Sequence, residues 1–171
     1  MVGPEVLFSG LFYYYRVMKK IGILFFAQLV AMCAIGQTVN PQYDSVLAKS
    51  LGADEYGMKQ YFLVILKTGA NTTSDKHFKD SCFMGHFSNM NKMVEAKQLV
   101  VAGPFGKNND QFRGLFILNA ANMEAAQQLV QTDPAVNAQL LKADIYPWYG
   151  TAALPEYLKS VDKVWKKKMA G

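Results

Sequence analysis

Cysteine and histidine are scarce in this chain. Its 171 residues include two cysteines, Cys33 and Cys82, and two histidines, His77 and His86. Cys33 lies in an N-terminal segment that we expect to be removed, which leaves Cys82 without a partner for an intramolecular disulfide. The histidines are nine residues apart, without cysteine or carboxylate groups at ligand spacing, so we expect no zinc site. We interpret Cys82 as a small buried hydrophobic residue of a helix.

Motifs for nucleotide cofactors and for a nucleophilic serine are also missing. The chain has neither a Gly-x-Gly-x-x-Gly pattern nor a P-loop, and it has no Gly-x-Ser-x-Gly elbow. We therefore predict that it uses no cofactor. The net charge is +5, but no basic face interleaved with aromatic residues runs through the chain, so we expect no nucleic-acid partner. Many of the lysines end the chain, where they suit the C-terminal end of a helix: Lys163, Lys166, Lys167 and Lys168.

The N-terminal segment has the pattern of a secretory signal. Met18-Lys19-Lys20 precedes the apolar run Ile21–Cys33, and Ala34-Ile35-Gly36 then supplies a small-x-small exit. We predict that residues 1–36 are a signal peptide whose true start is Met18. Cleavage between Gly36 and Gln37 would make the mature protein secreted or periplasmic.

Two other interpretations of this segment stay open. A membrane anchor would need about 20 apolar residues, and the charges of residues 16–20 interrupt that length. A lipoprotein would carry its lipid on Cys33, but Met32 stands where a small residue is expected. We favour cleavage, and we expect contact with a membrane only if Cys33 is lipidated.

The mature chain alternates between strand and helix patterns. Residues 37–58 read as a lead-in arm with a short helix at Tyr43–Leu51. The strands expected next are Gln60–Leu66, Leu99–Ala102, Phe112–Asn119 and Leu140–Trp148, and the helices are Asp75–Gln98 and Met123–Thr132. This βαββαβ order predicts an α+β domain of the ferredoxin-like type over residues 59–150. Residues 151–171 are expected to form an extra amphipathic helix, from Ala153 to Met169, and a basic tail.

One sheet face remains uncovered in this arrangement. The strand Gln60–Leu66 is too apolar to have one wet face, and the two helices cover only the other side. An apolar face of this size needs a partner, so we expect a homodimer in which two sheets pack face to face.

Four short motifs follow one another along the domain. They are His86, Gly103-Pro104-Phe105, Asp133-Pro134 and Pro147-Trp148. In this order the chain resembles the YciI-like (YCII-related) family of small α+β domains, over about residues 59–150. The resemblance implies a dimeric α+β barrel, and it implies that His86 and Asp133 form an acid–base pair.

His86 is the main candidate for catalysis. An imidazole can both take and give a proton near neutral pH, and a neighbouring aspartate would fix its tautomer. The resemblance therefore suggests a secreted, cofactor-free enzyme for elimination or isomerisation of a small molecule, with catalytic residues His86 and Asp133. The candidate residues for lining the site are Met90, Met93, Gly103, Pro104, Phe105 and Trp148, and for Trp148 a core position is the favoured alternative.

A purely structural role for His86 stays open as the alternative. His86 belongs to an apolar helical stripe with Phe78, Cys82, Phe83, Met90 and Met93. A histidine in such a stripe is often a core residue, and the protein would then be a non-catalytic binding or accessory module of the periplasm. The chain also departs from the family pattern. Phe83 replaces an arginine, Lys97 a glycine and Ala135 an aromatic residue, and the loss of the arginine predicts weaker binding of anions.

Overall fold

The computed structural model describes Tyr15, Met18–Lys19 and residues 40–166. The chain divides into two units, Met1–Tyr43 and Asp44–Gly171. In the first unit, residues 40–43 form a turn in which the Tyr43 amide donates to the Asn40 carbonyl at 3.1 Å. Most of the predicted signal peptide, with its cleavage point and Cys33, lies outside the described residues. Within the described part of the chain, no helix is long and apolar enough to span a membrane.

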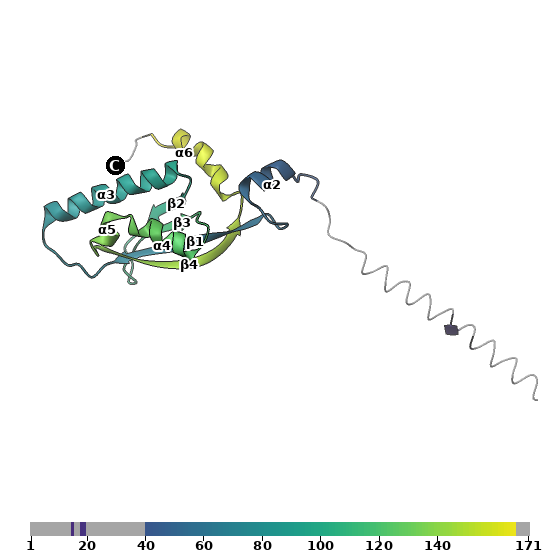
Figure 1. Ribbon diagram of the computed structural model, residues 1–171, viewed down its shortest axis with the longest axis horizontal. Helices are drawn as coiled ribbons and strands as arrows, with labels where there is room; N and C mark the ends of the chain where they lie inside the picture. Colours follow the sequence, from purple (N-terminus) through teal and green to yellow (C-terminus); the bar gives the residue numbers. More distant parts are fainter. Residues whose placement is uncertain (1–14, 16–17, 20–39, 167–171) are drawn as a thin grey trace, which may run out of the picture. The chain divides into compact units, whose positions relative to one another are not determined.

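The second unit is a four-stranded sheet with helices (Figure 1). Its elements are α2 (Ser45–Leu51), β1 (Met58–Thr68), α3 (Lys76–Glu95), β2 (Leu99–Pro104), β3 (Phe112–Leu118), α4 (Met123–Gln131), α5 (Pro134–Asn137), β4 (Leu141–Thr151), η1 (Leu154–Tyr157) and α6 (Leu158–Val164). The strand order is β2-β3-β1-β4, and all neighbouring strands are antiparallel. This is the ferredoxin-like α+β arrangement, which confirms the predicted fold class.

Side-chain caps set where the helices begin. The Asp75 carboxylate accepts from the Phe78 amide at 3.0 Å and starts α3, and the Asn122 side chain does the same for α4. After α3 the chain turns into β2 through Lys97, whose φ of 59° lies in the left-handed region. Glycine adopts this conformation without strain, whereas lysine does not.

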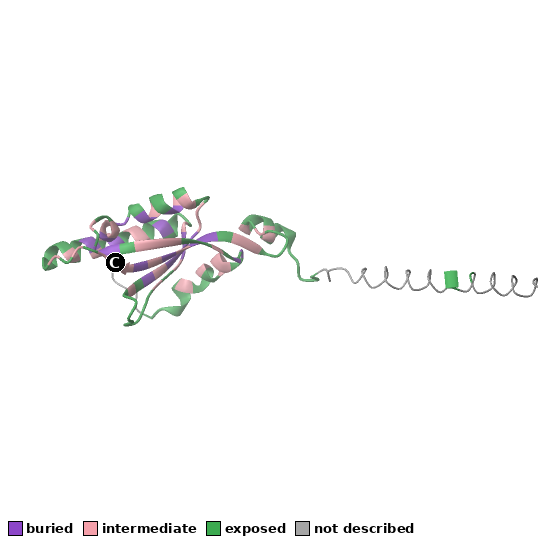
Figure 2. Ribbon diagram, turned by 90° about the horizontal axis from the view of Figure 1, so that it is seen from below, coloured by how far each residue is buried: buried purple, intermediate pink, exposed green. Residues whose placement is uncertain are grey.

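The main core lies between the sheet and helices α3, α4 and α5. Alternate residues of β1, namely Phe62, Val64 and Leu66, point to this side, where Cys82 of α3 and Val130 of α4 meet them. Buried positions run along the strands in Figure 2. Because side chains alternate along a strand, the residues between them face away from the helices. A smaller cluster forms there from Tyr61, Val100 and Ile117.

The second strand continues further than predicted. β2 runs to Pro104, and Gly103 and Pro104 pair with Leu115 and Gly114 of β3. We expected the strand to stop at Ala102 because proline cannot donate to a ladder. β2 is the edge strand of the sheet, so the missing proline N–H costs no ladder hydrogen bond.

The C-terminal helix is shorter than predicted and is split. Pro155 lies in the 3₁₀ turn η1, and α6 ends at Val164, whose side chain is 81% exposed and has no surface to pack against. Leu154 packs on the sheet face opposite the helices, and the Tyr157 hydroxyl donates to the Val100 carbonyl of β2. That carbonyl lies at a register shift between β2 and β3. The segment therefore covers part of an exposed sheet edge.

One residue of the predicted apolar stripe on α3 is not buried. Phe78 is exposed, whereas Cys82, His86 and Met93 are buried.

Candidate active site

His86 is held among aromatic rings on the inner face of α3. Its side chain is buried, with 7% of the residue exposed. The imidazole stacks on Phe116 of β3, with centroids 5.9 Å apart and planes at 20°. The rings of Phe83 and Phe87 meet it edge-on from the same helix. These contacts fix the plane of the imidazole and leave it one polar neighbour.

That neighbour is Asp133, which stands between α4 and α5. His86 Nδ1 lies 2.5 Å from Asp133 Oδ2, and the aspartate residue is 1% exposed. The other carboxylate oxygen, Oδ1, accepts from the Ala135 amide at 2.8 Å and thereby caps α5. Pro134 occupies the first turn of that helix, where a missing N–H is harmless. The predicted contact between His86 and Asp133 is therefore present.

The geometry assigns the ring tautomer. An ionised carboxylate only accepts hydrogen bonds, so the proton between the two groups belongs to Nδ1 of the imidazole. Nε2 then carries the lone pair of a neutral ring. Among the described residues, Nε2 has no hydrogen-bond partner. An imidazole oriented in this way can accept a proton from a molecule bound beside it.

Gly85 allows the two helices to come this close. A Cβ added at Gly85 would lie 2.8 Å from Cγ and 3.2 Å from Cβ of Pro134. Contacts below 3 Å do not occur between real atoms of this kind, so a side chain here would push α5 away from α3. Gly85 was not among the residues predicted for the site. A glycine inside a helix and next to the candidate histidine was the available signal, because interior glycine costs helix stability.

A cavity of about 530 Å³ opens beside the imidazole. His86 lines it, and so do three of the residues predicted for the site, Met90, Gly103 and Pro104. The remaining wall is mostly apolar and is formed by Leu66, Phe83, Phe87, Ala102, Gly114, Phe116, Leu141 and Trp165, with Asn91 and Arg113 as its other polar members. The size lies within the range of small-molecule sites.

Three residues predicted for the site lie elsewhere. Met93 is 4% exposed and belongs to the main core, one helical turn beyond Met90. Phe105 follows the end of β2 and packs against Phe112 instead. Trp148 packs on Tyr61, on the sheet face opposite the helices, because it alternates with the helix-facing residues of β4.

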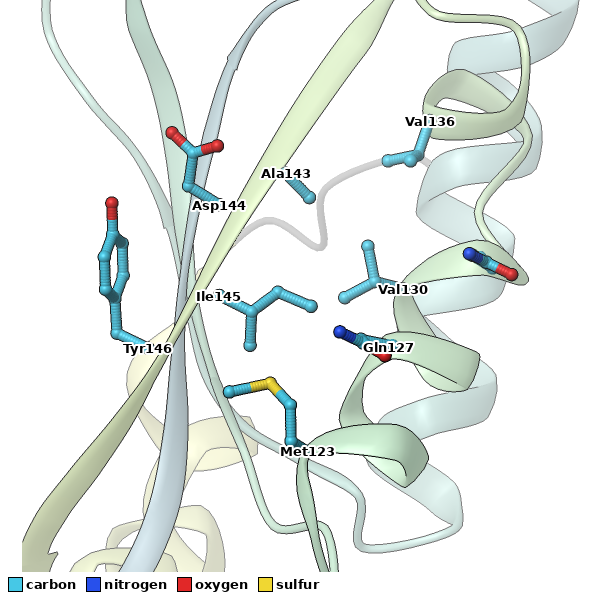
Figure 3. A pocket seen from close by; sticks show the side chains of 9 residues that line it. Met123, Gln127, Val130, Val136, Ala143, Asp144, Ile145 and Tyr146 are labelled. Atoms are coloured by element: carbon cyan, nitrogen blue, oxygen red, sulfur yellow. The ribbon is translucent and has the colours of Figure 1, made fainter.

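A second cavity, of about 730 Å³, lies between β4 and α4 (Figure 3). Met123, Val130 and Ile145 point into it, whereas Asp144 and Tyr146 point to the other side of the strand. Asp144 pairs with Lys67 and Lys142, and its hydrogen bond from Lys67 holds the carboxyl pKa below its ordinary value. This cavity therefore lacks a group suited to proton transfer. Within residues 40–166 and the short described stretches before them, no cluster of three or more histidine, cysteine or acidic residues could hold a metal.

The fold and the site together define a class. The protein is a ferredoxin-like α+β domain with a buried histidine–aspartate pair beside an apolar cavity. The family model of the YCII-related domain matches residues 31–149, which is most of the chain. The chain belongs to the YCII-related domain family, and the predicted resemblance is confirmed.

Other comparisons add little to this. No curated protein matches the sequence. Among solved structures, the chain is similar to 5-chloro-2-hydroxyhydroquinone dehydrochlorinase (TftG) from Burkholderia phenoliruptrix AC1100 in its complex with 2,5-dihydroxybenzoquinone. The identity is 18%, the match covers 52% of this chain and 92% of that chain, and the TM-score is 0.39. At that TM-score we draw no conclusion from the likeness.

Proposed function

We propose that the protein is a cofactor-independent acid–base enzyme that removes a proton from a carbon atom of a small molecule. One observation carries the proposal. His86 Nδ1 is bound to Asp133 at 2.5 Å, and the same imidazole lines a cavity of about 530 Å³. Membership of the YCII-related family supports it.

In the proposed reaction His86 is the base and Asp133 orients it. Nε2 takes the proton of a C–H bond, and the electron pair of that bond forms a C=C bond. In an elimination, a leaving group on the adjacent carbon departs with its bonding electrons. In an isomerisation, the double bond shifts and the imidazolium returns the proton to another carbon. Asp133 stabilises the imidazolium in both cases, and neither reaction consumes an oxidant or a reductant.

The first experiment follows proton removal directly. Purified protein in D₂O is mixed with a panel of cyclic ketones, quinols and β-halogenated carbonyl compounds. NMR then follows the loss of C–H signals, and ion chromatography follows halide release. We expect His86→Gln to abolish the reaction with any active compound. We expect Asp133→Asn to slow it by about 10²- to 10⁴-fold, because the ring would lose its fixed tautomer.

A matched control is available on the same helix. His77 is exposed in the first turn of α3, and His77→Gln removes a histidine without touching the cavity. We expect this variant to match the wild type. Equal turnover by wild type and His86→Gln for every active compound would refute the proposed role of His86.

A second candidate function is non-catalytic binding of a small apolar ligand. The packing of Phe83, Phe87 and Phe116 around His86 favours it, since a histidine among apolar rings can serve as a core residue. Under this alternative, ligands bind to wild type and to His86→Gln with similar affinity, and no C–H signal is lost in D₂O.

We also propose that two copies associate through the sheet face opposite the helices. Leu63, Ile65, Val101 and Leu115 are half-buried apolar residues of that face. Light scattering coupled to size exclusion tests the proposal. We expect Ile65→Lys to yield a monomer, whereas Val94→Lys, at an exposed position of α3, leaves the dimer intact. A monomeric wild type would refute it.

For the mature protein we propose export, with cleavage between Gly36 and Gln37. The pattern of charged, apolar and small residues supports this. Mass spectrometry of the protein from its natural host gives the test. A mature N-terminus at Gln37 is expected, and a lipid-modified Cys33 would replace this proposal with a membrane-tethered form.

A further inference from the structure

Arg113 is the one permanently charged side chain among the described residues that line the cavity beside His86. We expected a site without a cation, because Phe83 occupies the position of the family's arginine. Arg113 reaches the cavity from a different element, the start of β3. None of the lining residues that the structure describes is acidic.

Pairing of β2 with β3 places Arg113 at the rim. The Phe105 amide donates to the Arg113 carbonyl at 3.0 Å, which fixes the backbone of β3 against the end of β2. The arginine residue is exposed, and its guanidinium makes no ion pair or hydrogen bond with the described residues. Five N–H donors are therefore available for a ligand.

Small residues beside Arg113 keep the cavity open. Gly103 and Gly114 line it; Gly114 follows Arg113 in β3, and Gly103 of β2 pairs with Leu115, the residue after that. A Cβ added at Gly103 would meet no atom within 4 Å, so this position borders empty space. Aromatic rings also line the cavity, including Phe83 of α3 and Phe116 of β3.

We propose that the cavity selects small organic carboxylates, with an apolar ring-sized body against the aromatic wall and the carboxylate group at Arg113. The guanidinium fork matches the two oxygens of a carboxylate. A neutral ring alone would leave the guanidinium solvated and gain nothing from it. This inference rests on the proposed use of the cavity as a ligand site, and it names the chemical class of that ligand.

Two ligands that differ only in charge test the proposal. 2-Naphthoate and 2-naphthalenemethanol have the same ring system, and the dissociation constants of both are measured by NMR titration of the backbone amides. We expect the wild type to prefer the carboxylate by about three- to tenfold at low salt, since exposed ion pairs are weak and bidentate ones are stronger. The preference should shrink as salt is raised.

Variants locate the preference. Arg113→Gln should bind both compounds with the affinity of the alcohol, and Arg113→Lys should keep part of the preference because it keeps the charge but loses the fork. Lys107→Gln removes a cation from the neighbouring exposed loop, outside the cavity, and should behave as wild type. Gly103→Leu places a large side chain in the cavity and should weaken the binding of both ligands.

The results separate this inference from the proposed reaction. A preference that survives in Arg113→Gln, the lack of any preference in the wild type, or the failure of both compounds to bind would overturn it. Selective binding of 2-naphthoate, with no C–H signal lost from any compound of the reaction panel in D₂O, would support this inference and refute the acid–base reaction alone. Turnover of a neutral compound that Arg113→Gln leaves unchanged would refute the carboxylate preference and leave the reaction standing.

Discussion

The contact between Gly85 and Pro134 makes a sharp prediction about stability. Replacement of Gly85 by alanine adds one methyl group to the face of α3 that meets α5. The added carbon would lie 2.8 Å from Cγ of Pro134, about 1 Å closer than the ordinary separation of two carbon atoms. One of the two helices must therefore move.

Two effects of opposite sign set the magnitude. In an open helix, glycine to alanine stabilises by about 0.5–1 kcal/mol, because the unfolded chain loses freedom and the helix gains propensity. Overpacking at a tight contact costs about 1–3 kcal/mol. We expect the second effect to win, so that Gly85→Ala lowers the free energy of unfolding by about 1 kcal/mol.

Urea unfolding of four variants provides the assay. Pro134→Ala removes the atom that the new methyl group would meet, so the double variant Gly85→Ala/Pro134→Ala should recover at least about 1 kcal/mol relative to the sum of the single changes. Ser88→Ala, at an exposed position of the same helix, is the control for helix propensity and should change stability by less than about 0.5 kcal/mol.

Gly85→Ala should also disturb the site, since Pro134 follows Asp133 directly. We expect the chemical shift of the His86 ring to change in Gly85→Ala and to return in the double variant. If Gly85→Ala stabilises the protein by about 1 kcal/mol and leaves the chemical shift of the ring unchanged, the close packing of α3 and α5 does not position the pair.

Three further predictions follow from other residues. Lys97→Gly should raise the free energy of unfolding by about 0.5–1 kcal/mol, because it relieves a left-handed φ of 59°, whereas Lys92→Gly inside α3 should lower it by about 1 kcal/mol. Asp133→Ala should cost about 3 kcal/mol in urea unfolding, since α5 loses its cap and the buried Nδ1–H of His86 loses its acceptor; a loss below about 0.5 kcal/mol would contradict the geometry. Partial burial raises the pKa of Tyr157 above its ordinary value of 10.0, although 43% of the residue is exposed, so its contribution to stability is complete below pH 10 and is lost as the pH rises further. Unfolding curves from pH 8 to about 11 should show a slightly smaller alkaline decline for Tyr157→Phe than for Tyr43→Phe at a more exposed position, and equal declines would contradict the effect of this partial burial.

Much of the fold could be predicted because its signals are local. Capping residues such as Asp75 and Asn122 start helices through contacts with their own neighbours, and apolar runs such as that of β1 mark a central strand. The predicted length of the C-terminal helix was too great. An apolar pattern indicates a helix face but does not show whether another surface covers that face, and Val164 is exposed.

Only those residues of the candidate site that belong to the family's motifs could be predicted. Motif order led to His86 and Asp133, but it could not show which residues enclose the cavity. Arg113 was not predicted as a site residue. The pairing of β3 with β2 puts it at the site, and the register of that pairing cannot be read from the distance between the residues in the sequence. For Trp148 a core position was the favoured alternative to a place at the site, and alternation along β4 puts its side chain on the sheet face away from Ile145.

Asp133 joins the start of α5 and the orientation of His86 into one cooperative unit, since one oxygen serves each. Any local opening that frays α5 would release the carboxylate and let the imidazole turn. The hydrogen-exchange rate of the Ala135 amide therefore reports how often the pair opens, because this amide can exchange only while its hydrogen bond to Asp133 is broken. The lifetime of a competent site is thus set by a helix of four residues rather than by the sheet beneath it.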